Sequence, residues 1–302
     1  MMNEDQLSKY FEAVTIQDIP LIKSYLLKAG YPESNHNIVN MMIWLDFYPL
    51  YKVVHEHYML LLGIHEKEFF IYMPLCEKQY AKEAIIKAKS IFDFYNCTFN
   101  LSCYTKEMMD LALEIYPNYQ SCTRRSSTDY IHEITQFKTF SGKKLQKKRN
   151  HLNAFYKNYD GRYQYEDLNE KNLFECSAFI DSWKADSEDV WIVNEKQGIK
   201  RVLNLYNELN YKGGLIRIDG KVEAFLIIST LNKEMIQENV EKANDEIRGL
   251  YQAMTHQFFN HHHFDEPYIN REDDLGLENL RQAKLAYAPV YLLDKYWICK
   301  GG

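Results

Sequence analysis

The alternation of apolar and polar residues predicts a mixture of helices and strands along the 302-residue chain. In the first half, residues 18–30 are expected to form a helix, because Asp18 can cap its start and Gly30 can end it. Two apolar runs, 51–62 and 69–73, predict a hairpin that turns across the polar residues 65–68. The elements expected next are a helix at 78–95, a strand at 98–104, a helix at 106–116 and a strand at 129–134.

The second half repeats this order of elements. Strands at 215–218 and 222–230 are expected to pair across Asp219-Gly220, a dipeptide that supplies the positive φ angles of a tight turn. A helix at 250–260 places Leu250, Met254 and Phe258 on one face. The other elements expected are strands at 235–242, 268–270 and 290–298 and a helix at 278–287, with linking helices at 143–159, 171–184 and 196–211.

The repeated order of hairpin, helix, strand, helix and strand predicts an α/β (α+β) fold with two tandem domains, residues 1–125 and 126–302. Each domain is expected to be a mixed twisted sheet flanked by helices. The active cleft is expected in the second domain, because the polar constellations described below fall there.

Charge and composition narrow the class of protein. The formal charge of −6 and the isoelectric point of about 6.0 exclude nucleic-acid binding over the whole surface, so such a contact would need a local patch. We see no secretory signal and no apolar run near the ~20 residues of a membrane span. The six cysteines form no CxxC pair, and we interpret them as reduced thiols. These features predict a cytoplasmic protein without a membrane span.

A first candidate site lies where a strand is expected to meet a helix, at residues 244–250. Such a junction offers free backbone N–H groups and the positive end of a helix dipole, which suit a phosphate. Gly249 would let the backbone approach that phosphate and Arg248 would add charge, so Arg248, Gly249 and Leu250 are candidate cofactor-binding residues. The alternative is an ordinary loop that caps the helix.

A second candidate is a basic stripe on the helix expected at 143–159. Residues spaced three and four apart share one helix face, which places Lys144, Lys147, Lys148 and His151 together. In an acidic protein this stripe could contact the phosphates of tRNA, of a lipid head group or of a nucleotide. The alternative is a solvated helix face without a ligand.

A third candidate lies where strand 268–270 is expected to end, a common ligand position in α/β proteins. Asn270 and Arg271, with Lys284 on the following helix, are candidate substrate-binding residues. The alternative is structural, with Arg271 paired to a nearby carboxylate. The run His261-His262-His263 lacks a carboxylate or thiolate at ligand spacing, so we predict no metal site.

These residues resemble one bacterial family. The segments that carry the resemblance are Glu241-Lys242-Ala243, Arg248-Gly249-Leu250-Tyr251-Gln252, and residues 142–153, 268–276 and 280–289. The family is classed with the C-terminal domain of phosphatidylglycerol lysyltransferases, which put lysine from lysyl-tRNA onto a membrane lipid. Related proteins include the Fem transferases of peptidoglycan cross-bridges. The resemblance implies a tandem GNAT-like fold.

This sequence departs from the resembled enzymes in two ways. It lacks the membrane-spanning flippase part of true lysyltransferases, which puts a membrane-lipid acceptor in doubt. It also lacks the complete glycine-rich loop that binds acetyl-CoA, since Arg248-Gly249 is only a fragment of that loop. The acceptor could therefore be a small molecule, a lipid or a peptide.

The leading hypothesis is an acyl or aminoacyl transferase that moves an amino acid from aminoacyl-tRNA to an amine or a hydroxyl. Glu241, near the end of a strand, is the candidate base, and Tyr287 is the candidate acid toward the leaving group. No tightly bound cofactor is expected, and aminoacyl-tRNA is favoured over acyl-CoA as the donor. A conventional acyl-CoA-dependent N-acyltransferase and a non-catalytic binding module are the alternatives.

Overall fold

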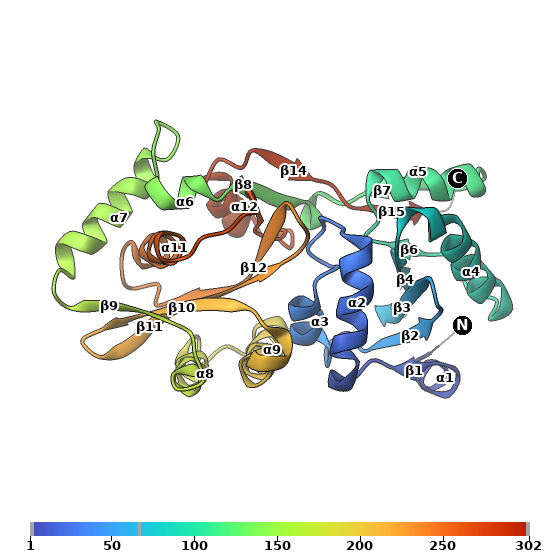
Figure 1. Ribbon diagram of the computed structural model, residues 1–302, viewed down its shortest axis with the longest axis horizontal. Helices are drawn as coiled ribbons and strands as arrows, with labels where there is room; N and C mark the ends of the chain where they lie inside the picture. The colour runs from blue at the N-terminus through green and yellow to red at the C-terminus, as the bar shows by residue number, and fades with distance from the viewer. Residues whose placement is uncertain (1–2, 66–67, 300–302) are drawn as a thin grey trace. The chain divides into compact units, whose positions relative to one another are not determined.

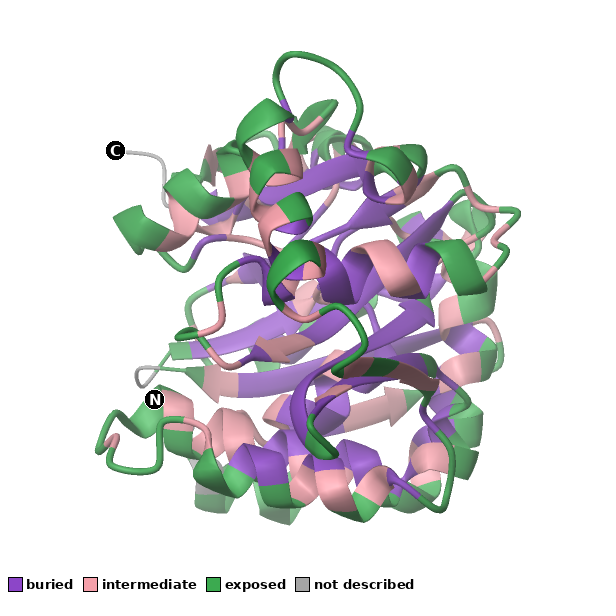
Figure 2. Ribbon diagram, turned by 90° about the vertical axis from the view of Figure 1, so that its left-hand side faces the viewer, coloured by how far each residue is buried: buried purple, intermediate pink, exposed green. Residues whose placement is uncertain are grey.

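The structure is a computed structural model that describes residues 3–65 and 68–299. The chain divides into two compact units, residues 1–128 with 294–302 and residues 129–293. Each unit has its own sheet flanked by helices (Figure 1). Figure 2 shows that buried residues gather in the strands, while the outward faces of the helices are exposed.

The first unit is built on a six-stranded sheet with the order β1-β2-β3-β4-β6, in which β5 also pairs with β3. Its strands are β1 (Glu12–Ala13), β2 (Leu50–Val54), β3 (Tyr58–His65), β4 (Glu68–Tyr72), β5 (Leu75–Cys76) and β6 (Leu101–Ser102). A separate ladder joins β7 (Gln120–Thr123) to β15 (Tyr296–Cys299). The α-helices of the first unit are α1 (Glu4–Tyr10), α2 (Ile19–Ala29), α3 (Ile38–Trp44), α4 (Ala81–Phe94) and α5 (Lys106–Ile115).

Several predictions for the first unit are confirmed and others need correction. The helix predicted at 18–30 is α2, and Gly30 ends it at φ 61°. Asp18 does not cap that helix; its carboxylate accepts from the backbone N–H of Thr15 and pairs with Lys52 at 2.7 Å. The hairpin of β3 and β4 forms, although two residues of its predicted turn lie outside the described residues.

Two strands of the first unit differ from their predicted lengths. The run predicted as one strand at 51–62 is the hairpin of β2 and β3, because the polar residues 55–57 form a turn closed by a bond from His55 N–H to the Tyr58 carbonyl. The strand predicted at 98–104 is reduced to the two residues of β6. Cys76 and Cys97 are free thiols, but Cys122 is disulfide-bonded, so the prediction of reduced thiols is wrong there.

The second unit is built on a seven-stranded mixed sheet with the order β14-β8-β13-β12-β11-β10-β9. Its strands are β8 (Asp129–Glu133), β9 (Tyr163–Asp167), β10 (Lys212–Ile218), β11 (Lys221–Thr230), β12 (Met235–Ala243), β13 (Tyr268–Asn270) and β14 (Tyr291–Leu293). Its helices are α6 (Thr135–Thr139), α7 (Gln146–Asn158), α8 (Leu173–Ser182), α9 (Val190–Asn204), α10 (Tyr206–Leu209), α11 (Leu250–His261) and α12 (Glu278–Leu285).

The central strands of this sheet are covered on both faces. On β11, Leu226 and Ile228 share a buried cluster with Ala253 and Phe258 of α11. Phe225, which points to the other face, packs against Phe179 of α8, with ring centroids 6.0 Å apart. Figure 1 shows α6, α7 and α11 on one side of the sheet and α8 and α9 on the other. A strand covered in this way is apolar on both faces, and β11 has eight consecutive buried residues.

The hairpin predicted across Asp219-Gly220 is confirmed, with φ angles of 51° and 84° at the two turn residues. The strand predicted at 290–298 is wrong as one element, because β14 joins the sheet of the second unit and β15 pairs with β7 in the first. The strand at 129–134 is β8, which belongs to the second sheet rather than the first. Strand β9 was not predicted.

Among the residues that the structure describes, no helix is both long enough and apolar enough to cross a bilayer.

Candidate functional site

Two glutamates of β12 point to the same face of the sheet because the strand contains a β-bulge. Glu241 lies opposite Leu226 and Glu238 lies opposite Ile228, with Asn239 as the extra residue between the two registers. Side chains three apart on a regular strand would point to opposite faces. The bulge shifts the alternation by one residue. Both glutamates therefore lie on the face that α11 covers.

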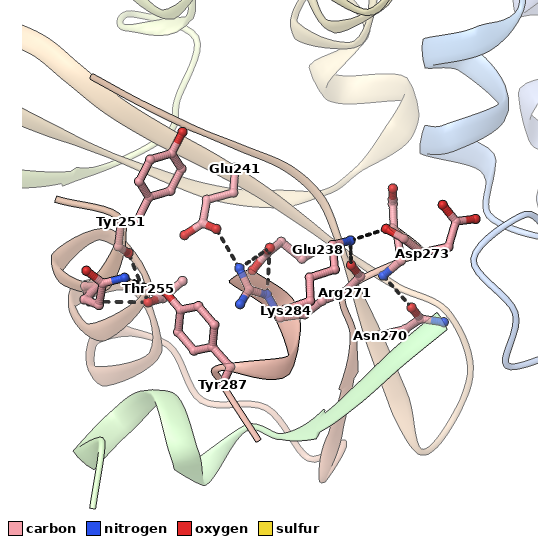
Figure 3. Close-up of polar contacts among 11 residues, drawn as sticks. Glu238, Glu241, Tyr251, Thr255, Asn270, Arg271, Asp273, Lys284 and Tyr287 are labelled. Carbon is pink, nitrogen blue, oxygen red and sulfur yellow. Dashed lines mark hydrogen bonds and ion pairs between the residues drawn. The ribbon is translucent and has the colours of Figure 1, made fainter. Parts of the chain in front are cut away.

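One guanidinium meets both carboxylates. Arg271, which follows β13, donates from Nη2 to Glu238 Oε1 at 2.7 Å and to Glu241 Oε2 at 2.6 Å, and from Nε to Glu238 Oε1 at 2.9 Å. Figure 3 shows the guanidinium beside both glutamates. The three side chains, which we name the Arg271 cluster, are between 7% and 10% exposed. In the described part of the chain, Glu238 Oε2 and Glu241 Oε1 are buried without a hydrogen-bond partner.

The Arg271 cluster is short of positive charge, and Glu241 shows the effect. Burial and the neighbouring Glu238 raise the pKa of Glu241 to about 8, although Arg271, Lys148 and Lys284 oppose this shift. The pKa of Arg271 is raised as well, because the two glutamates outweigh the effect of its burial. Arg271 therefore stays charged, whereas Glu241 exchanges a proton near neutral pH.

Tyr287, which follows α12, adds a hydroxyl beside the cluster. Gln252 of α11 donates to the Tyr287 hydroxyl at 2.7 Å, and the Tyr287 carbonyl accepts from Gln136 at 2.7 Å. The guanidinium carbon of Arg271 lies 4.6 Å from the centroid of the Tyr287 ring. Burial and Glu241 raise the pKa of Tyr287 above its ordinary value. The phenol thus keeps its proton and can donate it to a ligand.

The helix predicted at 143–159 is α7, which begins only at Gln146, so Lys144 of the predicted basic stripe lies in the turn before it. The stripe reaches this site through one residue. Lys148 Nζ lies 3.9 Å from the centroid of the Tyr287 ring, and this side chain is half-buried. Its burial, and then the charge of Arg271, lower the pKa of Lys148 to about 8. Lys144 and Lys147 are exposed. The pKa of His151 is lowered by burial and by its neighbours Arg248, Lys148 and Lys147, which shows that these cations lie near one another.

Lys284 and Asn270 hold the backbone around Arg271 rather than joining the cluster. Lys284 Nζ donates to the backbone carbonyls of Arg271 and Asp273, both at 2.5 Å. Asn270 donates to Asp129 Oδ2 at 2.8 Å and accepts from the Glu272 N–H at 2.7 Å. Figure 3 shows Asn270 on the side of Arg271 away from Tyr287.

A second buried carboxylate fixes the loop that follows Arg271. Asp274 accepts from the Tyr130 hydroxyl at 2.6 Å, from Arg281 Nε at 2.8 Å and from the Gly276 N–H at 2.9 Å. Although burial opposes it, these donors lower the pKa of Asp274 to about 2. Asp274 thus forms a buried ion pair with Arg281 of α12, which holds the loop between Arg271 and that helix.

The residues predicted to bind a phosphate have structural roles at the start of α11. Gly249 has φ 85°, and a Cβ built on it would lie 2.1 Å from the His151 carbonyl oxygen. Leu250 is fully buried in the core. Only Arg248 is exposed. The glycine is therefore explained by the close approach of α7, and the predicted phosphate contact falls to Arg248 alone.

Sequence reasoning missed three residues that line the site. Glu238 completes the cluster, Gln252 orients the Tyr287 hydroxyl, and His132 on β8 is fully buried near the Tyr287 ring. Burial and the charges of Arg271 and Lys284 lower the pKa of His132 to about 2, so this imidazole stays neutral. The polar run 237–239 inside a central strand could have indicated Glu238, since polar residues are seldom buried in such a strand unless they are paired.

In residues 3–65 and 68–299, no group of three histidine, cysteine, aspartate or glutamate side chains is placed to hold a metal ion.

Two units, each with a mixed sheet flanked by helices, give this chain a tandem GNAT-like fold. The predicted fold class is confirmed by the structure of FemX, which aligns at a TM-score of 0.58 with 10% identity over 94% of this chain and 96% of that chain. The chain belongs to the family described as phosphatidylglycerol lysyltransferase, C-terminal, whose model matches residues 29–299.

Other relatives agree with this family. A conserved protein of unknown function from Bacteroides thetaiotaomicron aligns at a TM-score of 0.88 with 28% identity over 97% of this chain and 99% of its own. L-PGS from Bacillus licheniformis aligns at 0.69 with 13% identity over 96% and 93%. An uncharacterised protein of Mycoplasmoides gallisepticum is 28% identical over 57% of this chain and 56% of its own length, so the match spans little more than half of that relative.

Proposed function

We propose that this protein is an aminoacyl transferase, which moves an amino acid from aminoacyl-tRNA to an amine or hydroxyl acceptor. The observation that carries the proposal is the Arg271 cluster, in which one buried guanidinium serves two carboxylates beside a tyrosine hydroxyl and a half-buried lysine. Buried charges arranged in this way are costly for stability, and such groups concentrate where proton transfer is needed.

Glu241 is the general base of the proposed reaction. Its pKa of about 8 lies close to neutral pH, where a group can both accept and release a proton. Its Oε2 is held by Arg271, which fixes the carboxylate and leaves Oε1 for the acceptor. Arg271 then acts as a positioning residue, and Glu238 keeps the guanidinium in place through two further hydrogen bonds.

Tyr287 is the general acid toward the leaving group. The acceptor nitrogen or oxygen attacks the ester carbonyl of the donor, and Glu241 takes the proton that the acceptor loses. The bond from the carbonyl carbon to the ribose oxygen breaks, and Tyr287 gives its proton to that oxygen. Glu241 then returns a proton to Tyr287 through the site. Gln252, which donates to the phenol oxygen, leaves the phenol proton free for this transfer.

The family and the basic residues support tRNA as the donor. A lysyltransferase, by its name, moves a lysyl group, and the resemblance to such enzymes implies an aminoacyl-tRNA donor. Lys144, Lys147 and Arg248 are exposed and suit a polyanion, and the charges of Lys147, Lys148 and Arg248 all act on His151. A CoA pyrophosphate would need successive free N–H groups at Gly249, but the Leu250 N–H donates to the Ile247 carbonyl at 3.2 Å.

The test is a transfer assay with the full chain. Total tRNA charged with labelled amino acids is incubated with lipid vesicles, peptides or small amines, and the label that leaves tRNA is followed with time. We expect the wild type to transfer the label and Glu241→Gln to lower the rate of transfer by at least 100-fold. The double variant Lys144→Glu/Lys147→Glu should bind tRNA more weakly, and its affinity should fall less steeply with added salt than that of the wild type. Glu208→Gln, on an exposed helix end, is the control.

Two outcomes would replace this proposal. Release of CoA from acyl-CoA without any turnover of aminoacyl-tRNA would make the protein a conventional acyl-CoA-dependent N-acyltransferase. Binding of tRNA or of a nucleotide without turnover of either donor would favour a non-catalytic binding module.

A further inference from the structure

The Arg271 cluster leaves two of its carboxylate oxygens without a hydrogen-bond donor among the described residues. Its two carboxylates present four oxygens, and the hydrogen bonds from Arg271 reach only Glu238 Oε1 and Glu241 Oε2. Glu238 Oε2 and Glu241 Oε1 have no partner among the described residues, and the two side chains are only 8% and 10% exposed. Buried carboxylate oxygens are nearly always hydrogen-bonded in proteins. The cluster therefore lacks a cationic donor.

One of the two unpaired oxygens, Glu241 Oε1, lies on the side of the cluster that faces Tyr287. Figure 3 shows one oxygen of Glu241 directed to Arg271 and the other directed away from it, toward the side on which Tyr251 and Tyr287 lie. The charge of Glu241 acts on both tyrosines, which raises the pKa of each in addition to the effect of burial. A small group bound to Glu241 Oε1 would thus lie among the residues assigned to proton transfer.

We propose that Glu238 and Glu241 bind a primary ammonium group, so that the acceptor of the transfer is an amine rather than a hydroxyl. This inference rests on the proposed function and names the acceptor class that it left open. An ammonium group carries three donors and one positive charge, which matches two unpaired oxygens and the net negative charge that the Arg271 cluster has when Glu241 is ionised. A hydroxyl has one donor and no charge, so one oxygen and the excess charge would stay uncompensated.

Proton transfer favours the same acceptor. An alkylammonium loses its proton at a pKa of ~10.4, whereas water, as a model for a hydroxyl, does so at ~15.7. Burial raises the pKa of Glu241 to about 8. The equilibrium constant for proton transfer to this carboxylate is then unfavourable by a factor of only ~10² for an ammonium but by ~10⁸ for a hydroxyl. Glu241 is a sufficient base for the first acceptor and a poor one for the second.

The cations around Glu241 allow this binding. Arg271 already donates to both carboxylates. Lys284 donates to two backbone carbonyls, and the charges of Glu272 and Asp273 favour its charged form. The remaining cation that acts on Glu241 is Lys148, and because burial and the charge of Arg271 lower its pKa to about 8, it holds its proton less firmly than an ordinary lysine and repels an entering ammonium less. His132 stays neutral, since burial lowers its pKa to about 2.

The proposed step is balanced in protons. The bound ammonium gives one proton to Glu241 and becomes the nucleophile. Its nitrogen attacks the ester carbonyl, an amide bond forms, and the ester bond to the ribose oxygen breaks. The second proton lost from nitrogen is returned through Tyr287 to that oxygen, and Glu241 releases the first proton to solvent. Each turnover with an ammonium acceptor therefore releases one proton, whereas a hydroxyl acceptor releases none.

The first experiment measures binding without any need for catalysis. Titration of the full chain with 1-butylammonium and with 1-butanol, followed by NMR of the tyrosine ring signals, compares a cationic with a neutral ligand of the same length. We expect the ammonium to bind at least tenfold more tightly and Glu238→Gln to remove this preference. Equal binding of the two probes, or no binding of the ammonium to the wild type, would overturn the proposal whether or not the variant folds.

The second experiment identifies the bond that is made. Labelled aminoacyl-tRNA is offered to vesicles that contain either an amine-bearing or a hydroxyl-bearing head group, and the product is treated with hydroxylamine, which cleaves esters but not amides. A resistant product formed only from the amine is expected, and an ester product would overturn the inference. If no label leaves tRNA, the proposed function fails and the binding experiment alone decides the ammonium site.

Discussion

Lys148 Nζ lies 3.9 Å from the centroid of the Tyr287 ring, so a residue of α7 and a residue that follows α12 meet at the Arg271 cluster. A cation at this distance is attracted by the face of an aromatic ring and favours a developing negative charge on its oxygen. The contact also distinguishes Lys148 from its exposed neighbours Lys144 and Lys147.

Replacing Lys148 should therefore affect catalysis more than tRNA binding. We expect Lys148→Met to lower kcat/KM for transfer by ~100-fold, a typical effect for a proton-transfer or charge-stabilising residue. The exposed Lys147→Met should change it by less than about threefold at physiological salt and serves as the matched control. Steady-state kinetics of both variants measure this, and equal losses would assign Lys148 to phosphate contact only.

Gly249 is required by both its backbone angle and its surroundings. Gly249→Ala would place a Cβ 2.1 Å from the His151 carbonyl oxygen at a φ of 85°, and we expect the free energy of unfolding to fall by about 3 kcal/mol. Gly142 has the same φ of 85° with nothing within 4 Å, so Gly142→Ala should cost only about 1 kcal/mol. Denaturant unfolding of both variants separates backbone strain from the clash. Equal losses would mean that α7 can move away from α11.

Asp274 should stabilise the loop after Arg271 in a pH-dependent way. Asp274→Asn leaves Arg281 without its buried partner and should cost about 3 kcal/mol at pH 7. The folded pKa of about 2 lies below the ordinary 3.8, so this stabilisation is present above pH 4 and is lost as the pH falls toward 2. The difference in Tm between variant and wild type should shrink over that range.

The control for Asp274 is Glu278, which lies 3.6 Å from the same arginine but is 68% exposed. Glu278→Gln should change the free energy of unfolding by less than about 0.5 kcal/mol. A cost as large as that of Asp274→Asn would show that Arg281, rather than the buried carboxylate, controls the loop.

Glu241 should lower the stability of the protein at alkaline pH. Its folded pKa of about 8 lies above the ordinary 4.5, so between these values the folded state holds a proton that the unfolded state has released. The free energy of unfolding then falls as the pH rises through this window. Glu241→Gln removes this effect while its amide oxygen can still accept from Arg271. Between pH 5 and pH 8.5, we expect the free energy of unfolding of the variant to rise by at least about 1 kcal/mol relative to that of the wild type.

Thermal unfolding across pH measures this gain, and Glu246→Gln on the exposed loop before α11 should show none. A variant that is less stable than wild type at every pH would mean that Glu241 is a structural ion-pair residue. A variant that is more stable but inactive would place Glu241 among residues kept for chemistry at the expense of stability.

The elements of both sheets were predictable where local signals are strong. Asp219-Gly220 specifies its own turn, and the spacing of Leu250, Met254 and Phe258 specifies a helix with one buried face. The division between β14 and β15 was not predictable, because only pairing with distant strands shows that they belong to different units. The basic stripe was visible, but that Lys148 is half-buried while Lys144 and Lys147 are exposed depends on how α7 packs.

The candidate site was predictable only in its residue types. Glu241, Arg271 and Tyr287 were chosen by their place along the chain, and the structure brings them together. Gly249 was misleading, since a glycine needed for a close helix contact looks the same in sequence as one needed for a phosphate. Glu238 was missed because the alternation rule places it on the face opposite to Glu241.

The single residue Asn239 sets which chemistry each face of β12 carries. Lys242, the next residue after Glu241, points to the opposite face and pairs with Glu195 of α9 at 2.8 Å. If Asn239 took part in the regular ladder instead of forming the bulge, the alternation would continue without a break, and the residues that follow it would turn to the opposite face relative to Glu238. Lys242 would then enter the site in place of Glu241, and a carboxylate would face Glu195. One residue that touches no substrate thus decides whether the strand presents a base or a cation to the reaction.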